Sequence, residues 1–221
     1  MVDRGFYNKK INFVNSFIQG IIKMKGIVKA NTVDKYLYPI RKQIIGLIEL
    51  NSTVLEFGCG NGDLLFKLSS KIRTGIGFDK SQALITYANN RKEKENIKNL
   101  DFKVIDLTKE SLSTYKFDYS VTSLLFHILN WENALELLNK KLALSRTTIV
   151  CGFCKPTNTK QSTLLWLDQR FTSHYHNYLT YKNNGFTKGL IETIENVEYT
   201  EFDTFDPVIK IYKITQTFYT D

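Results

Sequence analysis

The chain has 221 residues, 43% of them hydrophobic and 13% aromatic, which is enough for one sizeable hydrophobic core. No stretch approaches the roughly 20 uninterrupted apolar residues of a membrane span, and three cysteines do not make a disulfide framework. These features exclude a membrane-spanning protein and a disulfide-rich scaffold, and we expect a soluble protein of the cytoplasm.

The net charge of +8 is concentrated at the N-terminal end, where residues 1–50 hold nine Lys or Arg against three acids. Such asymmetry can indicate a surface for nucleic acid or an anionic substrate, or only solvated helix faces. We favour the second interpretation, because the basic residues are scattered and no RNA-binding motif accompanies them.

Two helical patterns occupy the N-terminal region. Apolar residues recur at helical spacing through residues 13–22, with an end near Gly26, and again through residues 33–48, where Pro39 fits only near a helix start or a kink. We expect residues 1–50 to form helices that cover a core or the mouth of an active site.

From residue 51 on, short apolar runs alternate with helical patterns, which is typical of a parallel sheet. The predicted strands cover residues 53–57, 74–78, 101–105, 117–122 and 147–152. The predicted helices cover residues 63–70, 81–90 with Ser81 as N-cap, and 131–143 with Asn130 as N-cap. Five strand-helix units result.

The C-terminal pattern differs, because two strand-like runs at residues 197–204 and 208–216 flank Asp206 and Pro207 with no room for a helix. They predict a hairpin, so the last strand is antiparallel to its neighbour. We expect residues 51–221 to form the core domain, with residues 155–192 as an insertion that covers the substrate.

Three glycines follow the first predicted strand at alternate positions, Gly58, Gly60 and Gly62, and a helix begins after them. Glycine there lets the backbone approach a ligand closely at the carboxyl end of the strand. A dinucleotide fingerprint requires glycine where this chain has Asp63, whose carboxylate would also repel a pyrophosphate, and no P-loop lysine follows. A nucleoside ligand without a pyrophosphate remains.

Here the sequence resembles the class I S-adenosylmethionine-dependent methyltransferases, whose first motif is an acidic residue followed by GxGxG. Asp79 ends the second strand, where it could bind ribose hydroxyls, and Asp106 resembles the family's acid near the adenine amino group. The resemblance implies an α/β three-layer sandwich with a mostly parallel seven-stranded sheet whose last strand is antiparallel. The cofactor-binding residues that it implies are Glu56, Gly58, Cys59, Gly60, Gly62, Asp79, Lys80, Asp106, Leu107 and Ser123.

The family's reaction is a direct in-line displacement on a sulfonium, for which a catalytic base is optional. His127, beyond the fourth strand, is the candidate catalytic residue, although it could equally brace its loop. Candidate substrate residues are Tyr36, Arg170, His174 and Tyr178. We expect no metal site, since His174 and His176 would lie on different faces of a helix.

The acceptor class is narrowed by what the motifs lack. Residues 123–126 replace the Asn/Asp-Pro-Pro-Tyr signature of enzymes that methylate amino groups of bases or glutamine, so a small-molecule acceptor is favoured. An RNA methyltransferase that uses the basic N-terminal region, or a non-catalytic cofactor-binding protein, stays as an alternative. Cys151 and Cys154 form a CxxC, which we interpret as two inert thiols at the end of a strand, since Pro156 follows.

Overall fold

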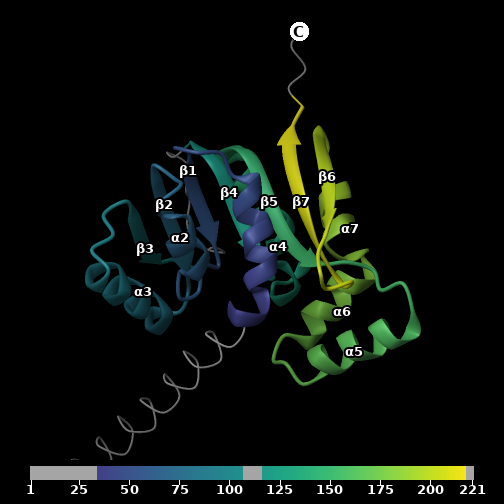
Figure 1. The fold of residues 1–221 in the computed structure, drawn as a ribbon. Helices are drawn as coiled ribbons and strands as arrows, with labels where there is room; N and C mark the ends of the chain where they lie inside the picture. Colours follow the sequence, from purple (N-terminus) through teal and green to yellow (C-terminus); the bar gives the residue numbers. More distant parts are fainter. Residues whose placement is uncertain (1–33, 107–115, 218–221) are drawn as a thin grey trace, which may run out of the picture. The chain divides into compact units, whose positions relative to one another are not determined.

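A computed structural model describes residues 34–106 and 116–217 (Figure 1). The chain divides into two compact units, residues 1–38 and residues 39–221. The predicted helix at residues 13–22 and the predicted site residue Leu107 lie outside the described residues. The second unit includes residues 39–50, because Ile40, Ile44 and Ile48 of this segment are buried. The predicted division at residue 50 stays a prediction.

One seven-stranded sheet forms the centre of the second unit, in the order β3-β2-β1-β4-β5-β7-β6. Its strands are β1 (Thr53–Phe57), β2 (Thr74–Asp79), β3 (Leu100–Val104), β4 (Phe117–Ser123), β5 (Ser145–Phe153), β6 (Val197–Asp203) and β7 (Ile209–Gln216). The first five pair in parallel, whereas β7 is antiparallel to both β5 and β6. The predicted mostly parallel sheet with an antiparallel last strand is confirmed.

Helices flank the sheet on both faces, so the predicted three-layer arrangement is also confirmed (Figure 1). Within the second unit they are residues 39–47 of a helix that spans residues 34–47, then α2 (Asp63–Leu68), α3 (Gln82–Lys94), the short 3-10 helix η1 (Phe126–Ile128), α4 (Trp131–Leu144), α5 (Thr159–Arg170), α6 (Tyr175–Asn183) and α7 (Phe186–Glu192). Ser81 caps α3 and Asn130 caps α4, each with its side chain accepting a backbone N–H. Both predicted caps are correct.

The hydrophobic core follows from burial of the central strands on both faces, as parallel sheets require. Val54, Leu55 and Phe57 of β1 and Ile149 and Val150 of β5 are almost fully buried. The edge strand β6 instead alternates between half-buried and exposed residues. The glycine motif therefore follows one of the most rigidly packed strands of the sheet.

Three helices, α5, α6 and α7, occupy the predicted insertion between β5 and β6. Figure 1 shows α5 and α6 at the end of the sheet to which the parallel strands point. α6 packs on η1, where Asn177 Nδ2 donates to the Ile128 carbonyl at 2.8 Å, and α7 packs on β5. α6 is thus placed beside the loop that follows β4, and α5 packs on α6.

No helix within residues 34–106 and 116–217 is long and apolar enough to cross a membrane.

Candidate functional site

The carboxyl ends of the first four strands meet at one edge of the sheet. Phe57, the last residue of β1, is in register with Phe78 of β2 and with Thr122 of β4. Asp79 is in register with Val104 near the end of β3. The predicted cofactor residues from four separate segments therefore lie along a single edge, the usual ligand site of an open α/β sheet.

The glycine loop is anchored to the end of β2 by its backbone. The N–H groups of Gly58 and Cys59 both donate to the Phe78 carbonyl, at 2.8 and 3.0 Å. Gly62 has a φ of +79°, and a Cβ on it would lie 2.5 Å from Cε1 of Phe102, so no other residue fits there. Gly60 has a φ of +56°, but a Cβ on it would meet no atom within 4 Å. The loop therefore packs closely against the sheet at Gly62 and leaves open space at Gly60, where a ligand can approach the backbone.

Asp79 connects the loop to the start of α3. Its Oδ2 accepts the Gly60 N–H at 2.9 Å, and its Oδ1 accepts the Ser81 N–H at 2.8 Å. Each carboxylate oxygen has a second lone pair, so Asp79 can still accept two hydroxyl hydrogen bonds. The carboxylate is half-buried and beside the open space at Gly60. This arrangement suits the predicted contact with a ribose.

Asp106 lies next to this carboxylate along the edge, because the N–H of the preceding Ile105 donates to the Asp79 carbonyl at 3.0 Å. Asp106 itself is exposed, and so is Lys80. Both are positioned to reach a ligand at the carboxyl ends of β2 and β3.

The end of β4, where the resemblance placed the cofactor residue Ser123, carries backbone and burial features that the sequence did not show. Leu124 has a φ of +50°, which is unusual for leucine, and its N–H donates to the Cys151 carbonyl at 2.8 Å. The hydroxyl oxygens of Thr122 and Ser123 are buried, and no hydrogen-bond partner for either is found among the described residues. Leu125 covers Gly58, since its side chain would lie 3.2 Å from a Cβ there.

Glu56 is buried directly before the glycine loop, with 4% of its surface exposed. Burial raises its pKa to about 8, while the nearby cations Arg41 and Lys141 lower it and the carboxylates Asp63 and Asp79 raise it. Within the described part of the chain, its Oε2 has no hydrogen-bond partner. Glu56 is therefore protonated in this structure at neutral pH.

The surroundings of Asp63 correct the sequence-based argument that its carboxylate would repel a pyrophosphate. Its carboxylate forms close ion pairs with Arg41 and Lys67, and Arg91 lies 3.9 Å away. It is buried and neutralised, so it does not present a free negative charge that would repel an anion at the start of α2. The exclusion of a dinucleotide fingerprint rests on the missing glycine alone. Nothing in the sequence pattern linked residue 41 to residue 63.

His127 lies in an aromatic cluster at η1. Its ring centroid is 4.7 Å from that of Phe153, 5.3 Å from that of His174 and 6.4 Å from that of Tyr181. Burial and the neighbouring His174 lower its pKa to about 3, so the imidazole is neutral. Two predicted site residues from distant segments, His127 and His174, are thus brought together.

The other predicted substrate residues are not brought into that contact. Tyr178 is buried and packs edge to face on Phe153 and Phe186, so its ring belongs to the core. Arg170 is exposed, with its guanidinium 5.0 Å from the Trp166 ring centroid. Tyr36, half exposed, belongs to the first compact unit.

All three cysteines are free and buried. Burial raises the pKa of Cys151 to about 12 and also raises that of Cys154, so neither thiol is a reactive thiolate at neutral pH. The interpretation of the CxxC as inert thiols at the end of β5 agrees with this. Residues 34–106 and 116–217 contain no cluster of three or more side chains that could hold a metal ion.

Comparison with known proteins points to one family. The sequence model of a family described as "Methyltransferase domain" matches residues 48–178. A protein of Invertebrate iridescent virus 6, named "Putative methyltransferase 235L", is 40% identical over 86 residues, which cover 38% of this chain and 29% of that protein. The chain thus aligns with under a third of that relative's length.

Solved structures share the fold at low identity. A protein from Pyrococcus horikoshii matches with a TM-score of 0.64 at 13% identity, covering 84% of this chain and 91% of that one. An S-adenosylmethionine-dependent methyltransferase from Aquifex aeolicus matches with a TM-score of 0.60 at 17% identity, covering 85% and 97%. Magnesium protoporphyrin IX methyltransferase from Synechocystis, solved with S-adenosylhomocysteine, has a TM-score of 0.54 at 17% identity, covering 91% and 88%.

The family match spans more than half of the chain, and the strand order, the antiparallel β7 and the glycine loop agree with it. The chain belongs to the methyltransferase-domain family and has the Rossmann-like fold of the class I S-adenosylmethionine-dependent methyltransferases.

Proposed function

We propose that this protein transfers a methyl group from S-adenosylmethionine to a small-molecule acceptor by direct in-line displacement. The observation that carries the proposal is the link between the open glycine loop and the Asp79 carboxylate, which sit side by side at the carboxyl edge of the sheet. When bound, the cofactor would supply a methyl group on a sulfonium, whose positive charge makes the neutral thioether S-adenosylhomocysteine a good leaving group.

The residues present fit such a cofactor. Gly60 leaves room for a nucleoside against the loop backbone, and Asp79 retains lone pairs for two ribose hydroxyls. Asp106 would receive the adenine amino group one strand further along the edge, and Ser123 would face the sulfonium side with its unpartnered hydroxyl. Lys80, Glu56, Cys59 and Leu107 complete the proposed cofactor site.

The acceptor would lie beside η1 and α6, at the carboxyl edge of the sheet. A neutral His127 can accept a hydrogen bond from an acceptor hydroxyl or amine, but a pKa of about 3 makes it a weak base in the free protein. We assign His127 as a positioning residue, with His174 at its ring edge and Arg170 and Tyr178 on the adjoining helices. Orientation and exclusion of water would then provide most of the rate enhancement.

The small-molecule class is supported by the aromatic surroundings of His127, which suit a compact, partly apolar acceptor. The RNA alternative relied on the basic N-terminal region. Of its nine basic residues, Arg41 is buried in an ion pair with Asp63 and is unavailable to a phosphate.

Calorimetric titration with S-adenosylmethionine and S-adenosylhomocysteine, with NADH as the control ligand, tests the cofactor assignment. We expect both adenosyl ligands to bind and NADH not to bind. Asp79→Ala should weaken binding at least tenfold through loss of the ribose contacts, whereas Asp101→Ala, a half-buried acid near the opposite end of β3, should change affinity less than twofold.

A failure of folded wild-type protein to bind either adenosyl ligand would contradict the proposal. Binding without formation of S-adenosylhomocysteine across a panel of hydroxyl, amine and thiol acceptors would instead support the non-catalytic alternative. Circular dichroism of both variants establishes that they are folded before the affinities are compared.

A further inference from the structure

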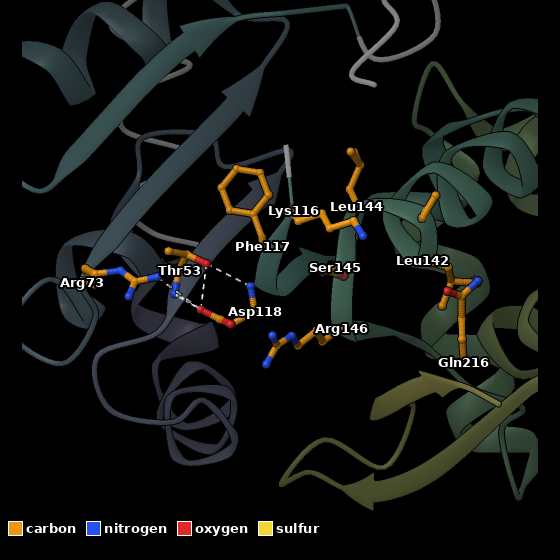
Figure 2. A pocket seen from close by; sticks show the side chains of 11 residues that line it. Thr53, Arg73, Lys116, Phe117, Asp118, Leu142, Leu144, Ser145, Arg146 and Gln216 are labelled. Carbon is orange, nitrogen blue, oxygen red and sulfur yellow. Dashed lines mark hydrogen bonds and ion pairs between the residues drawn. The ribbon is translucent and has the colours of Figure 1, made fainter. Parts of the chain in front are cut away.

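A pocket lies at the edge of the sheet opposite the glycine loop, where the parallel strands begin. Its volume is about 390 Å³, and it is lined by the starts of β1, β4 and β5 together with the end of β7 (Figure 2). This volume is within the range of small-ligand pockets, about 300–1,000 Å³. The proposed methyl-transfer site is at the other ends of β1 and β4, so this pocket belongs to neither the cofactor nor the acceptor.

The charges of the pocket do not balance. Three basic residues line it, Arg73, Lys116 and Arg146, against one acid, Asp118. Asp118 is already engaged, because its Oδ2 accepts both the N–H and the hydroxyl of Thr53 at 2.8 Å. These hydrogen bonds lower its pKa despite partial burial, and Arg73 lies 3.9 Å from the same oxygen.

Lys116 and Arg146 are the less compensated cations of the pocket, although the charge of Arg146 also helps to lower the pKa of Asp118. Both are exposed, and no ion pair within 4 Å is found for either among residues 34–106 and 116–217. Dashed lines in Figure 2 join Thr53, Asp118 and Arg73, while Lys116 and Arg146 carry none. An anion in the pocket would therefore not have to break a close ion pair of these two side chains among the described residues.

The rest of the lining combines apolar residues with the polar residues Thr53, Ser145 and Gln216. Phe117, Leu142 and Leu144 are buried residues that contribute to the wall. Ser145 also lines the pocket, but its hydroxyl already donates a hydrogen bond to the Lys141 carbonyl at 2.9 Å. A ligand therefore meets cations at the rim and hydrocarbon beneath them, which favours a molecule with one acidic group and one apolar portion.

We propose that this pocket is a binding site for a small organic anion, with its acidic group against Lys116 and Arg146 and its apolar portion against Leu142 and Leu144. The site is independent of the proposed methyl transfer. An extended nucleic acid is disfavoured as its occupant, because phosphate backbones are bound by a stripe of basic residues rather than by a concave pocket of this size.

Calorimetric titration with phenyl phosphate, inorganic phosphate and benzyl alcohol tests the proposal on the full chain. We expect phenyl phosphate to bind most tightly, inorganic phosphate more weakly and benzyl alcohol not at all. Lys116→Ala and Arg146→Ala should each weaken phenyl phosphate binding at least fivefold, and Arg146→Lys should retain most of it. The matched control is Lys98→Ala, because Lys98 is exposed and does not line the pocket.

Equal affinity of wild-type protein and the Lys116→Ala/Arg146→Ala double variant would overturn the site. So would benzyl alcohol binding as tightly as phenyl phosphate, since the cations would then be irrelevant. Binding of a single-stranded RNA oligonucleotide that is lost in the double variant and outcompetes phenyl phosphate would assign the surface to nucleic acid instead. All substituted residues are exposed, so each variant is expected to melt at the wild-type temperature.

Discussion

Burial shifts the pKa of three ionisable residues near the proposed site in the direction that favours their neutral forms. Burial raises the pKa of Glu56 to about 8, lowers that of Lys141 far below its ordinary value and lowers that of His127 to about 3. Lys141 Nζ lies 4.8 Å from the Phe57 ring centroid and, within the described part of the chain, has no hydrogen-bond partner. Desolvation of the charged form exceeds the attraction between Glu56 and Lys141 at these positions.

Glu56 gives the folding stability a defined pH dependence. Its pKa is 4.5 when unfolded and about 8 when folded, so between these values the folded state binds more protons than the unfolded state. The free energy of unfolding therefore falls as pH rises from 4.5 to about 8, by at most about 5 kcal/mol at roughly 1.4 kcal/mol per pH unit.

The substitution Glu56→Gln removes the titrating group while keeping the shape of the neutral carboxyl. Its free energy of unfolding, measured by urea denaturation at pH 5 and pH 8, should fall less than that of the wild type. Glu198→Gln, at an exposed residue of β6, is the matched control and should follow the wild type. Parallel curves for wild type and Glu56→Gln would show that the carboxyl is ionised throughout.

Two glycines of the same loop have different roles, one in packing against the sheet and one in leaving space for a ligand. Gly62 faces the Phe102 ring with no room for a Cβ, while Gly60 faces open space. The spacing of the glycines alone predicted that both positions let the backbone approach a ligand. Only the packing distinguishes a glycine required by the sheet from a glycine available to a ligand.

Alanine substitutions test this distinction. Gly62→Ala should destabilise the protein by about 2–4 kcal/mol, because the backbone conformation and the Phe102 contact both oppose it. Gly60→Ala should cost only about 1 kcal/mol but weaken S-adenosylhomocysteine binding at least tenfold. Gly46→Ala in the helix at residues 34–47 meets nothing within 4 Å, and it should stabilise the protein by about 0.5–1 kcal/mol.

Thermal and urea denaturation give the stabilities, and calorimetry gives the affinities. A Gly60→Ala protein that binds S-adenosylhomocysteine like the wild type would contradict the placement of the ligand at this loop. A Gly62→Ala protein as stable as Gly46→Ala would contradict the described packing on Phe102.

Element boundaries were predicted closely where their signals are local. β1 matches its prediction exactly, and α3 and α4 begin after the predicted caps Ser81 and Asn130. The insertion after β5 was predicted as one segment, yet it contains three helices. Its helix α5 carries a weak amphipathic pattern, since Leu164 and Leu167 on it and Phe171 directly after it are exposed.

At the scale of the whole molecule, a buried ion pair connects the helix at residues 34–47 to α2. Arg41 and Asp63 are both buried, and Lys67 joins them on the same carboxylate. Removing one partner leaves a buried charge without compensation, which typically costs about 3–5 kcal/mol. The pair thus opposes any separation of this helix from the sheet.

A double-mutant cycle measures this coupling. Asp63→Asn and Arg41→Met should each destabilise the protein by roughly 2–4 kcal/mol, and the double variant by clearly less than their sum. The control cycle uses Glu136→Gln and Lys140→Met, an i,i+4 pair on α4 that is more exposed, whose coupling should stay below about 0.5 kcal/mol. Additive effects for Arg41 and Asp63 would mean that the pair is not formed in solution.

The sequence by itself determined the strands, the caps, the antiparallel hairpin and the glycine motif, and with them the family. Each of these depends on residues within a few positions of one another, through backbone conformation, side-chain periodicity or loop length. Only the tertiary structure decided that Arg41 neutralises Asp63, that His127 meets His174 and that basic residues from three segments surround a pocket at the amino-terminal edge. These contacts join residues more than 20 positions apart in the sequence. The pKa shifts of Glu56 and His127 come mainly from burial of their side chains, which exists only once the sheet and its helices have packed.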